Sequence, residues 1–278
     1  MTDWSVDLST IVLLAGLVLI DGVRQVPAGA VLVRRAVGRP WEVAGEPAER
    51  GGWRLVSWLP PFVTTVVLRP KSADGAASAA SAASADGAAR LATASRTTRR
   101  LFPLELATLG SLVLGIPVAV AIAGGSGFLL ALALVLVLAV TTALLAGSAL
   151  RKLELPARER RWKVVAWCSP FAAPFAAEGV LEAAVRGTTV LEGLQLLLPT
   201  SAFLRVIRPR AYDHLVRGQA DPELAKVVGR DLLEQAIAQA PLSFDATTRS
   251  LCPRCGMTSL LETGECRACE VPLERAIP

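Results

Sequence analysis

The sequence predicts a multi-pass α-helical membrane protein with three transmembrane helices, one N-terminal anchor and one tight hairpin, and with three cytoplasmic parts: a small β-rich module, a helical region and a cysteine-rich tail. Three observations predict this class. Hydrophobic residues make up 53% of the 278 residues, and the mean hydropathy of +0.48 is high for a soluble protein. Apolar runs long enough to cross a bilayer have basic residues at their ends. Four of the five cysteines gather near the C-terminus, too close together for a disulfide framework spread over a secreted fold.

The first predicted element is an N-terminal transmembrane anchor, residues 1–24, built on the apolar run Leu8–Ile20. A bilayer core needs about 20 helical residues, so the run spans only together with its borders. No Lys or Arg precedes Arg24, so the positive start of a secretory signal is missing. We therefore expect an uncleaved anchor with the N-terminus outside. Asp21 is interpreted as a boundary residue, with an ion or proton ligand as the alternative.

Residues 25–70 are expected to form the small β-rich cytoplasmic module. From Val26 to Arg69, short runs of β-branched and aromatic residues are separated by Gly and Pro, a pattern typical of strands joined by turns. The Ala/Ser/Gly segment Ser72–Ala89 then predicts a flexible linker over residues 71–100. The apolar anchor, the VPAG turn, a strand ending in an Arg-Gly turn and a later strand opening Pro-Phe together resemble the start of the stomatin/prohibitin (SPFH) family. The long helical remainder of that family does not follow.

The strongest pattern is a transmembrane hairpin, residues 101–152. Two apolar runs between Leu104 and Leu150 are joined by the tight sequence GGSG at 124–127, and each run has the length of about 20 residues that a bilayer requires. Both outer ends are expected in the cytoplasm because basic residues flank them; these are Arg96, Arg99, Arg100, Arg151, Lys152, Arg158, Arg160 and Arg161. Pro117 should kink the first helix, and Glu105 is interpreted as a boundary residue at the hairpin entrance.

Small residues recur at every fourth position in both hairpin helices, a spacing that lets helices approach closely in a membrane. The first row is Ser111, Gly115, Ala119 and Ala123, and the second is Ala131, Ala139, Ala143 and Gly147 with Val135 between. Generic alanine richness would give the same pattern. In either case we expect the hairpin to pack on itself or on a protein partner.

Residues 153–248 are expected to form a cytoplasmic or interfacial helical region. Apolar spacing predicts helices over 171–186, 188–198, 201–217 and 221–240. The last helix is expected to be capped by Asp221 and Pro222. The stretch 162–185 is apolar enough for a fourth, re-entrant or surface membrane segment, with Trp162 and Trp167 at the headgroup level. Glu178, Glu182 and Glu192 are expected on solvated helix faces.

The tail, residues 249–278, carries the motif with the most defined chemistry. Cys252 and Cys255 form one Cys-x-x-Cys pair, ten residues follow, and Cys266 and Cys269 form a second. Two such pairs supply four thiolates at about 2.3 Å from a zinc ion. The sequences CPRCG and CRAC resemble a small zinc ribbon with rubredoxin-like knuckles. Iron in the same shell and a redox dithiol pair stay as alternatives.

Other functions find less support in the sequence. The insert between the cysteine pairs lacks an aromatic stacking platform, so nucleic-acid binding is not expected, and the net charge of +5 is attributed to membrane orientation. The single histidine, His214, is expected at the surface and Cys168 in packing; no P-loop, dinucleotide fingerprint, HExxH or GxSxG motif occurs.

We therefore expect a non-enzymatic scaffold, adaptor or assembly subunit of the cytoplasmic (inner) membrane, with its C-terminus in the cytoplasm. Its partners would be lipid and protein, with no small-molecule substrate. The alternatives are a subunit of a transporter or channel complex, or an iron-loaded electron-transfer membrane protein.

Overall fold

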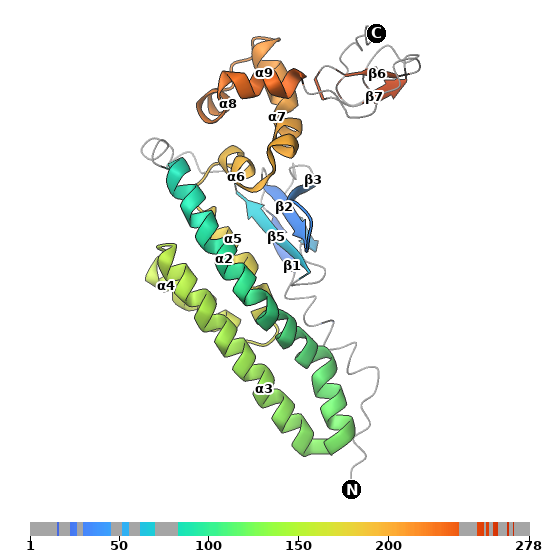
Figure 1. The fold of residues 1–278 in the computed structure, drawn as a ribbon, viewed down its shortest axis with the longest axis vertical. Coiled ribbons are helices and arrows are strands. Elements are labelled where there is room, and N and C mark those ends of the chain that lie inside the picture. Colours follow the sequence, from blue (N-terminus) through green and yellow to red (C-terminus); the bar gives the residue numbers. More distant parts are fainter. Residues whose placement is uncertain are drawn as a thin grey trace. The chain divides into compact units, whose positions relative to one another are not determined.

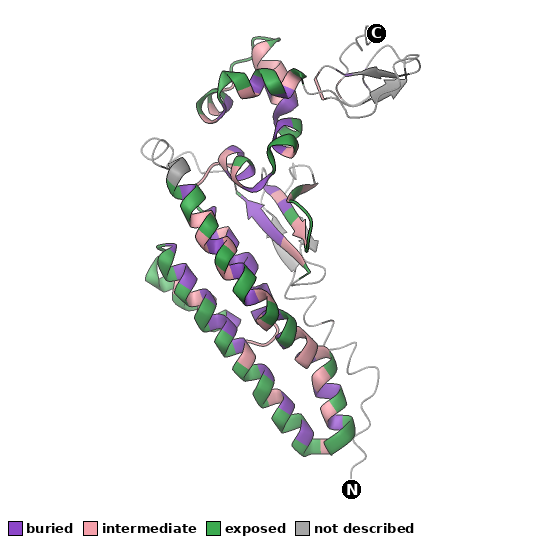
Figure 2. Cartoon of the chain, viewed as in Figure 1, coloured by how far each residue is buried: buried purple, intermediate pink, exposed green. Residues whose placement is uncertain are grey.

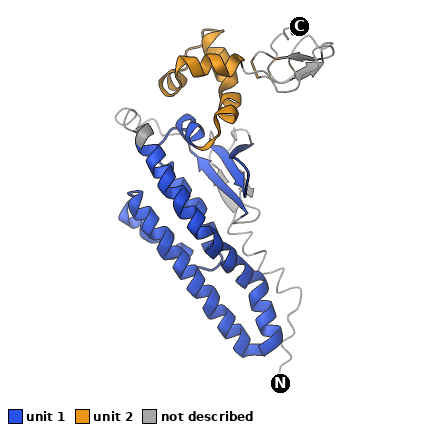
Figure 3. Ribbon diagram, viewed as in Figure 1, with its two compact units in different colours: residues 1–196 blue, residues 197–278 orange. Residues whose placement is uncertain are grey.

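The computed structural model describes residues 16, 23–26, 30–45, 52–55, 62–69, 83–238, 249–252, 254–255, 258–260, 266 and 269. The chain divides into two compact units, residues 1–196 and residues 197–278 (Figure 3). The first unit contains small sheets and a long helical segment, and the second contains short helices and the cysteine-rich tail (Figure 1).

Two small antiparallel sheets form in the segment for which the sequence predicts β structure. β2 (Val31–Ala36) is the central strand between β3 (Glu42–Gly45) and β5 (Val63–Leu68). β1 (Val23–Val26) pairs separately with β4 (Gly52–Leu55). The register places Val33 opposite Val66, and both side chains are fully buried. Because side chains alternate between the two faces of a strand, this pair puts one face of the sheet against a core.

A long helical segment follows, made of α2 (Ala83–Gly110), the π-helical turn η2 (Ser111–Gly115) and α3 (Ile116–Lys152). It reverses direction at Gly124, whose φ of 58° and ψ of −137° suit a residue without a Cβ. The legs before and after this point run side by side (Figure 1). At Gly127 a Cβ would lie only 2.1 Å from the carbonyl oxygen of Ala119. The predicted tight turn is therefore present at 124–127, and glycine is what allows it.

The two predicted rows of small residues have different environments. Ala131, Val135, Ala139 and Ala143 of the second row are all buried, so this row packs inside unit 1. Ser111, Gly115 and Ala119 of the first row line an apolar groove together with Leu130 and Leu134. η2 lies just before Pro117, which has no N–H to continue the regular hydrogen-bond ladder.

Among the described residues, one helix is long and apolar enough to span a membrane: Asp86–Lys152, with a mean hydropathy of 2.9 in its most apolar stretch. Only 28% of that stretch is buried, and exposed positions recur along both legs of the hairpin (Figure 2). Ile122, Leu130 and Leu144 are among the exposed apolar residues. The predicted anchor Leu8–Ile20 lies outside the described residues apart from Gly16, and Asp21 lies outside them as well. Three transmembrane helices therefore remain a prediction.

α2 begins at Ala83, within the segment 71–100 that the sequence predicted as a flexible linker. For residues 83–100 the structure has helix instead. Alanine favours helix, and one side of this helix is stabilised by burial: Ala94 and Leu101 are fully buried, and Gly87 lies close to the Leu196 side chain. Tertiary packing therefore orders part of a segment whose composition alone suggested a linker.

The stretch 162–185, considered as a fourth membrane segment, forms short elements. α4 (Ala157–Trp167) packs along α3, and η3 (Ala173–Phe175) leads into α5 (Ala176–Ala184). None of these has the length of a span. Trp162 is exposed, as a surface position requires, but Trp167 is buried against Gly179, where a Cβ would lie 2.4 Å from its ring.

The remaining helices are α6 (Val190–Leu197), α7 (Thr200–Leu215), α8 (Pro222–Val227) and α9 (Arg230–Ala238). The single helix predicted over 221–240 is wrong: it is broken at Val228, which has an extended conformation before Gly229. The predicted cap is correct, because the Asp221 carboxylate accepts a hydrogen bond from the N–H of Leu224 at 3.0 Å. β6 (Arg249–Leu251) and β7 (Thr258–Leu260) form an antiparallel pair in the tail.

Candidate metal centre

The four tail cysteines that the sequence singled out come together in the structure. The Sγ atoms of Cys252, Cys255, Cys266 and Cys269 all lie within 4.8 Å of one another, and those of Cys255 and Cys266 are 3.7 Å apart. A tetrahedron with metal–sulfur bonds of about 2.3 Å has sulfur–sulfur edges of about 3.8 Å. The observed sulfur positions therefore fit a four-thiolate metal site.

Each Cys-x-x-Cys pair contributes one deep and one shallower sulfur. Cys252 and Cys266 are buried, whereas Cys255 and Cys269 are half-buried. The N–H of Cys269 donates to the carbonyl of Cys266 at 3.2 Å, which closes the second knuckle. Burial raises the pKa of the Cys269 thiol, so metal binding must release its proton and becomes weaker as the pH falls.

An arginine inside the first pair ties the cysteine cluster to α7. Arg254 stands between Cys252 and Cys255, and its Nη2 and Nε donate to Oδ2 of Asp213 at 2.6 and 3.1 Å. The hydrogen bonds to Asp213 raise the pKa of Arg254. A guanidinium that makes two charged hydrogen bonds to one carboxylate holds a fixed orientation. The first knuckle is thereby held against the helical part of unit 2.

A second arginine lies near the sulfurs from the α7 side. Arg208 is only 6% exposed. Burial lowers the pKa of its guanidinium, while the charges of Cys252 and Cys255 oppose this change. Four thiolates around a divalent metal leave an excess of negative charge, which a neighbouring cation stabilises. Arg208 is thus placed to offset the charge of a loaded cluster.

The chemistry of this donor set is that of a closed site. All four ligand positions of a tetrahedral metal would be filled by sulfur, so none remains open for a substrate or an activated water. A four-thiolate shell suits zinc and iron alike. The arrangement therefore supports folding or electron transfer rather than hydrolytic chemistry.

Among the described residues, the other residues named from the sequence are not part of the four-sulfur group. Cys168 is a free thiol at the end of α4, half-buried. His214 has a structural contact, since its Nδ1 accepts the N–H of Asp221 at 3.2 Å. Glu192 caps the start of α6 with Thr189, each side chain accepting from the other residue's N–H.

Two acidic residues are buried, and for one of them, Glu178, the prediction is wrong. Glu178 was expected on a solvated face but is 2% exposed, and its Oε1 accepts from the N–H and the hydroxyl of Thr65 at 2.9 and 2.7 Å. Glu105 stays a predicted boundary residue at the hairpin entrance; it is 1% exposed, and it accepts the N–H of Ala177 at 2.7 Å. Both carboxylates hold α5 in place, Glu178 against the sheet and Glu105 against α2. Helical spacing gave no sign of these partners.

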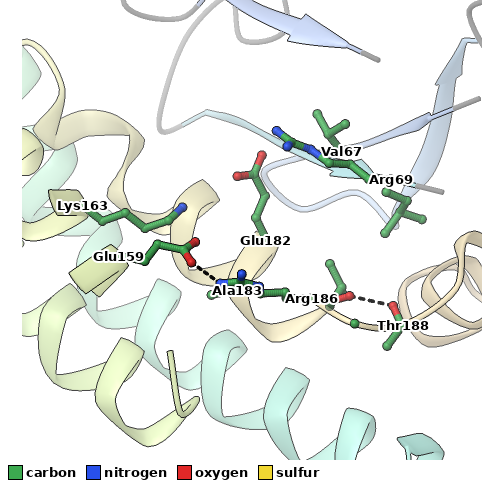
Figure 4. Close-up of a pocket in the computed structure, with 11 residues that line it drawn as sticks. Val67, Arg69, Glu159, Lys163, Glu182, Ala183, Arg186 and Thr188 are labelled. Atoms are coloured by element: carbon green, nitrogen blue, oxygen red, sulfur yellow. Dashed lines mark hydrogen bonds and ion pairs between the residues drawn. The ribbon is translucent and has the colours of Figure 1, made fainter. Parts of the chain in front are cut away.

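A cavity of about 250 Å³ lies in unit 1 beside the end of β5, α4 and the end of α5. Figure 4 shows the ion pair between Glu159 and Arg186 on its wall. Lys163 and Glu182 also line it, so positive and negative side chains are mixed. Arg69 also lines the cavity, so two carboxylates there offset most of the charge of three basic side chains.

The sequence missed the residues around the cysteine cluster. Arg208, Asp213 and Arg254 were not singled out, and only the place of Arg254 inside the motif gave a signal. Comparison with known proteins finds no family model, no curated protein and no solved structure that matches the chain. The resemblance to the stomatin/prohibitin family therefore has no support from these comparisons.

Proposed function

We propose that this protein is a non-enzymatic scaffold or adaptor of the cytoplasmic (inner) membrane that presents a zinc-stabilised ribbon to protein partners. The observation that carries the proposal is the closed four-cysteine cluster held to α7 through Arg254 and Asp213. A ribbon of this size cannot bury a core, so metal binding would supply its folding free energy. Zinc is the metal proposed, and iron is the alternative.

The membrane part of the proposal is supported by the helix Asp86–Lys152. A core helix of a soluble protein is mostly buried, whereas the apolar stretch of this helix is 28% buried. Ile122 is 81% exposed and Leu130 is 77% exposed, which is unfavourable in water and neutral in lipid. Basic residues flank both ends of the hairpin, so the positive-inside rule favours both ends, and the C-terminus, in the cytoplasm.

The first experiment measures the metal. The full chain, purified in an uncharged detergent without added metal, is analysed for bound elements. About one zinc per chain, lost in a Cys252→Ser/Cys255→Ser variant and kept in Cys168→Ser, supports the ribbon. Cys168 is the matched control because it is the one cysteine outside the cluster. A coloured preparation with iron in that stoichiometry would overturn the adaptor assignment in favour of electron transfer.

The second experiment tests the adaptor role. Proteins that co-purify from detergent extracts are identified for the wild type, for the cluster variant and for Cys168→Ser. The proposal expects a defined partner with wild type and Cys168→Ser that is absent with the cluster variant. Partners that persist unchanged without the cluster contradict a role for the ribbon in recognition. Solute or ion flux in reconstituted vesicles would favour a transporter subunit instead.

Orientation is tested separately with a thiol reagent that cannot cross membranes. In intact cells the tail cysteines should stay unlabelled even after metal removal, and they should become labelled once the membrane is opened. Labelling of the demetallated tail in intact cells, or a disulfide-linked tail, contradicts the proposed topology.

A further inference from the structure

Three arginines from separate parts of unit 1 meet at one cavity. The cavity has a volume of about 410 Å³ and lies where the turn after β2, the strand β5, α2 and α5 approach one another. Arg35 comes from β2, Arg39 from the turn and Arg99 from α2. Thr64, Phe102 and Glu105 also line the cavity. Residues far apart in the sequence thus place positive charge around one space.

Local structure explains how two of these arginines reach the cavity. Arg35 is half-buried, and its guanidinium lies over the ring of Trp41 at 4.9 Å from the centroid, a favourable cation–π arrangement. Arg39 follows Gly38, whose φ of 76° suits glycine. The N–H of Arg39 donates to the carbonyl of Ala36 at 3.0 Å. The turn therefore directs the chain so that Arg39 lines the cavity.

The positive charge is not offset by ion pairs within the described part of unit 1. Arg34, next along the same strand, is paired with Glu42 at 2.8 Å, but no salt bridge to a described residue involves Arg35, Arg39 or Arg99. Burial and the nearby Arg99 charge lower the pKa of Arg35, so the guanidiniums repel one another. An anion in the cavity would relieve this repulsion.

The one carboxylate that lines the cavity is already engaged. Glu105 accepts the backbone N–H of Ala177 at 2.7 Å, and three cations still face one carboxylate. The cavity beside α4 differs, because there Glu159 and Glu182 accompany the basic residues and Glu159 is paired with Arg186. The balance of charge therefore distinguishes the three-arginine cavity from the cavity beside α4.

We propose that this cavity binds a phosphate group through Arg35, Arg39 and Arg99. Guanidinium groups present several N–H donors in a plane and bind phosphate oxygens in pairs, and the Thr64 hydroxyl adds a further donor at the wall. A phosphate carried by a membrane lipid is the source best suited to the position of the cavity. Phe102 lies on α2 just before the apolar part of the hairpin begins, where headgroups would meet a spanning helix.

The phosphate site does not depend on the proposed adaptor function, since it lies in unit 1 and uses no residue of the ribbon. The choice of a lipid as the source depends on the membrane placement of the hairpin. The two can fail separately: a chain without zinc or partners could still bind phosphate, and a zinc-loaded adaptor could lack the site.

The test measures binding to the full chain in an uncharged detergent. The probes are dioctanoyl phosphatidic acid, dioctanoylglycerol, which has the same chains without the phosphate, and glycerol 3-phosphate with inorganic phosphate as soluble sources. The proposal expects phosphatidic acid to bind at least about tenfold more tightly than dioctanoylglycerol, since the phosphate is the group recognised. If the soluble phosphates bind as tightly as phosphatidic acid, the phosphate site is supported and its ligand is a soluble phosphate rather than a lipid.

Matched variants locate the binding. Arg39→Gln and Arg99→Gln remove exposed side chains that line the cavity, and each should weaken phosphate binding about tenfold, the loss of one charged contact. Arg34→Gln, on the strand that precedes the turn of Arg39, and Arg100→Gln, next to Arg99 on α2, change the net charge equally. Both should stay within about twofold of the wild type because neither residue lines the cavity.

Two results overturn the proposal. If none of the phosphate compounds binds the wild-type chain more tightly than dioctanoylglycerol, the cavity is not a phosphate site. If all four variants weaken binding equally, the attraction is that of general surface charge. Circular dichroism and the thermal unfolding midpoint of each variant, compared with those of the wild type, verify that the fold is kept.

Discussion

The hydrogen bonds between Glu178 and Thr65 allow the packing of unit 1 to be tested directly. β5 is an edge strand of the three-stranded sheet, and the N–H of Thr65 points away from β2 to the Glu178 carboxylate on α5. The Thr65 hydroxyl donates to the same oxygen. Both residues are almost fully buried. We expect Glu178→Ala to separate α5 from the sheet edge.

The magnitude follows from what the change leaves behind. A buried donor that loses its acceptor costs about 1–3 kcal/mol, and bonds to a charged group lie toward the upper end of that range. Two donors lose their acceptor, while the cost of burying the carboxylate itself is removed. We therefore expect Glu178→Ala to lower the free energy of unfolding by about 2–4 kcal/mol. Thr65→Val removes the hydroxyl alone and should cost about 1 kcal/mol.

The assay is equilibrium unfolding by denaturant in detergent, followed by far-UV circular dichroism and by tryptophan fluorescence. Trp167 is a suitable probe because it is buried against Gly179, next to the altered residue. Glu234→Ala is the control, since that side chain is exposed and its ion pair among the described residues is with Arg230, an interaction worth about 0.5 kcal/mol or less. In the double-mutant cycle, Glu178→Ala and Thr65→Val should couple by about 1 kcal/mol. If Glu178→Ala costs no more than Glu234→Ala, the reasoning is refuted.

Three further predictions concern other parts of the chain. Gly127→Val should lower the thermal unfolding midpoint, because a side chain there meets the Ala119 carbonyl; Gly110→Ala, which meets nothing within 4 Å, should leave it unchanged or raise it. Partial burial raises the pKa of Asp221, but hydrogen bonds from Leu224 and Arg210 outweigh it and leave the pKa below the ordinary value of 3.8. The ionised carboxylate therefore stabilises unit 2 at neutral pH, and this stabilisation is lost as the pH falls below 3.8. In Asp221→Asn the free energy of unfolding of unit 2 should depend less on pH in that range. After a chelator removes the metal, four tail thiols should react with a thiol reagent while circular dichroism shows the helices intact. Loss of all helical signal in parallel would contradict a ribbon that folds separately.

The features that the sequence predicted depend on composition and short spacing. The GGSG turn was found because glycine alone tolerates the conformation of Gly124 and the close approach at Gly127. The Asp221 cap was found because its hydrogen bond joins residues three apart. The cysteine cluster was found because the spacing of two Cys-x-x-Cys pairs nearly determines the knuckle geometry.

The features that the sequence missed join residues far apart in the chain. Glu178 is separated from Thr65 by 113 positions and Arg254 from Asp213 by 41, and no periodicity links such positions. The helix from Ala83 to residue 100 was missed for a related reason, since its stability comes from packing rather than from its own sequence.

The sequence by itself therefore determined that the chain carries apolar helical segments and a set of four thiols, because local composition and spacing fix both. Only the tertiary structure decided which charged side chains surround the thiols, which carboxylates are buried, and where three arginines meet. The physical reason is that burial and electrostatic environment are set by neighbours in space, which the folded chain brings from distant positions.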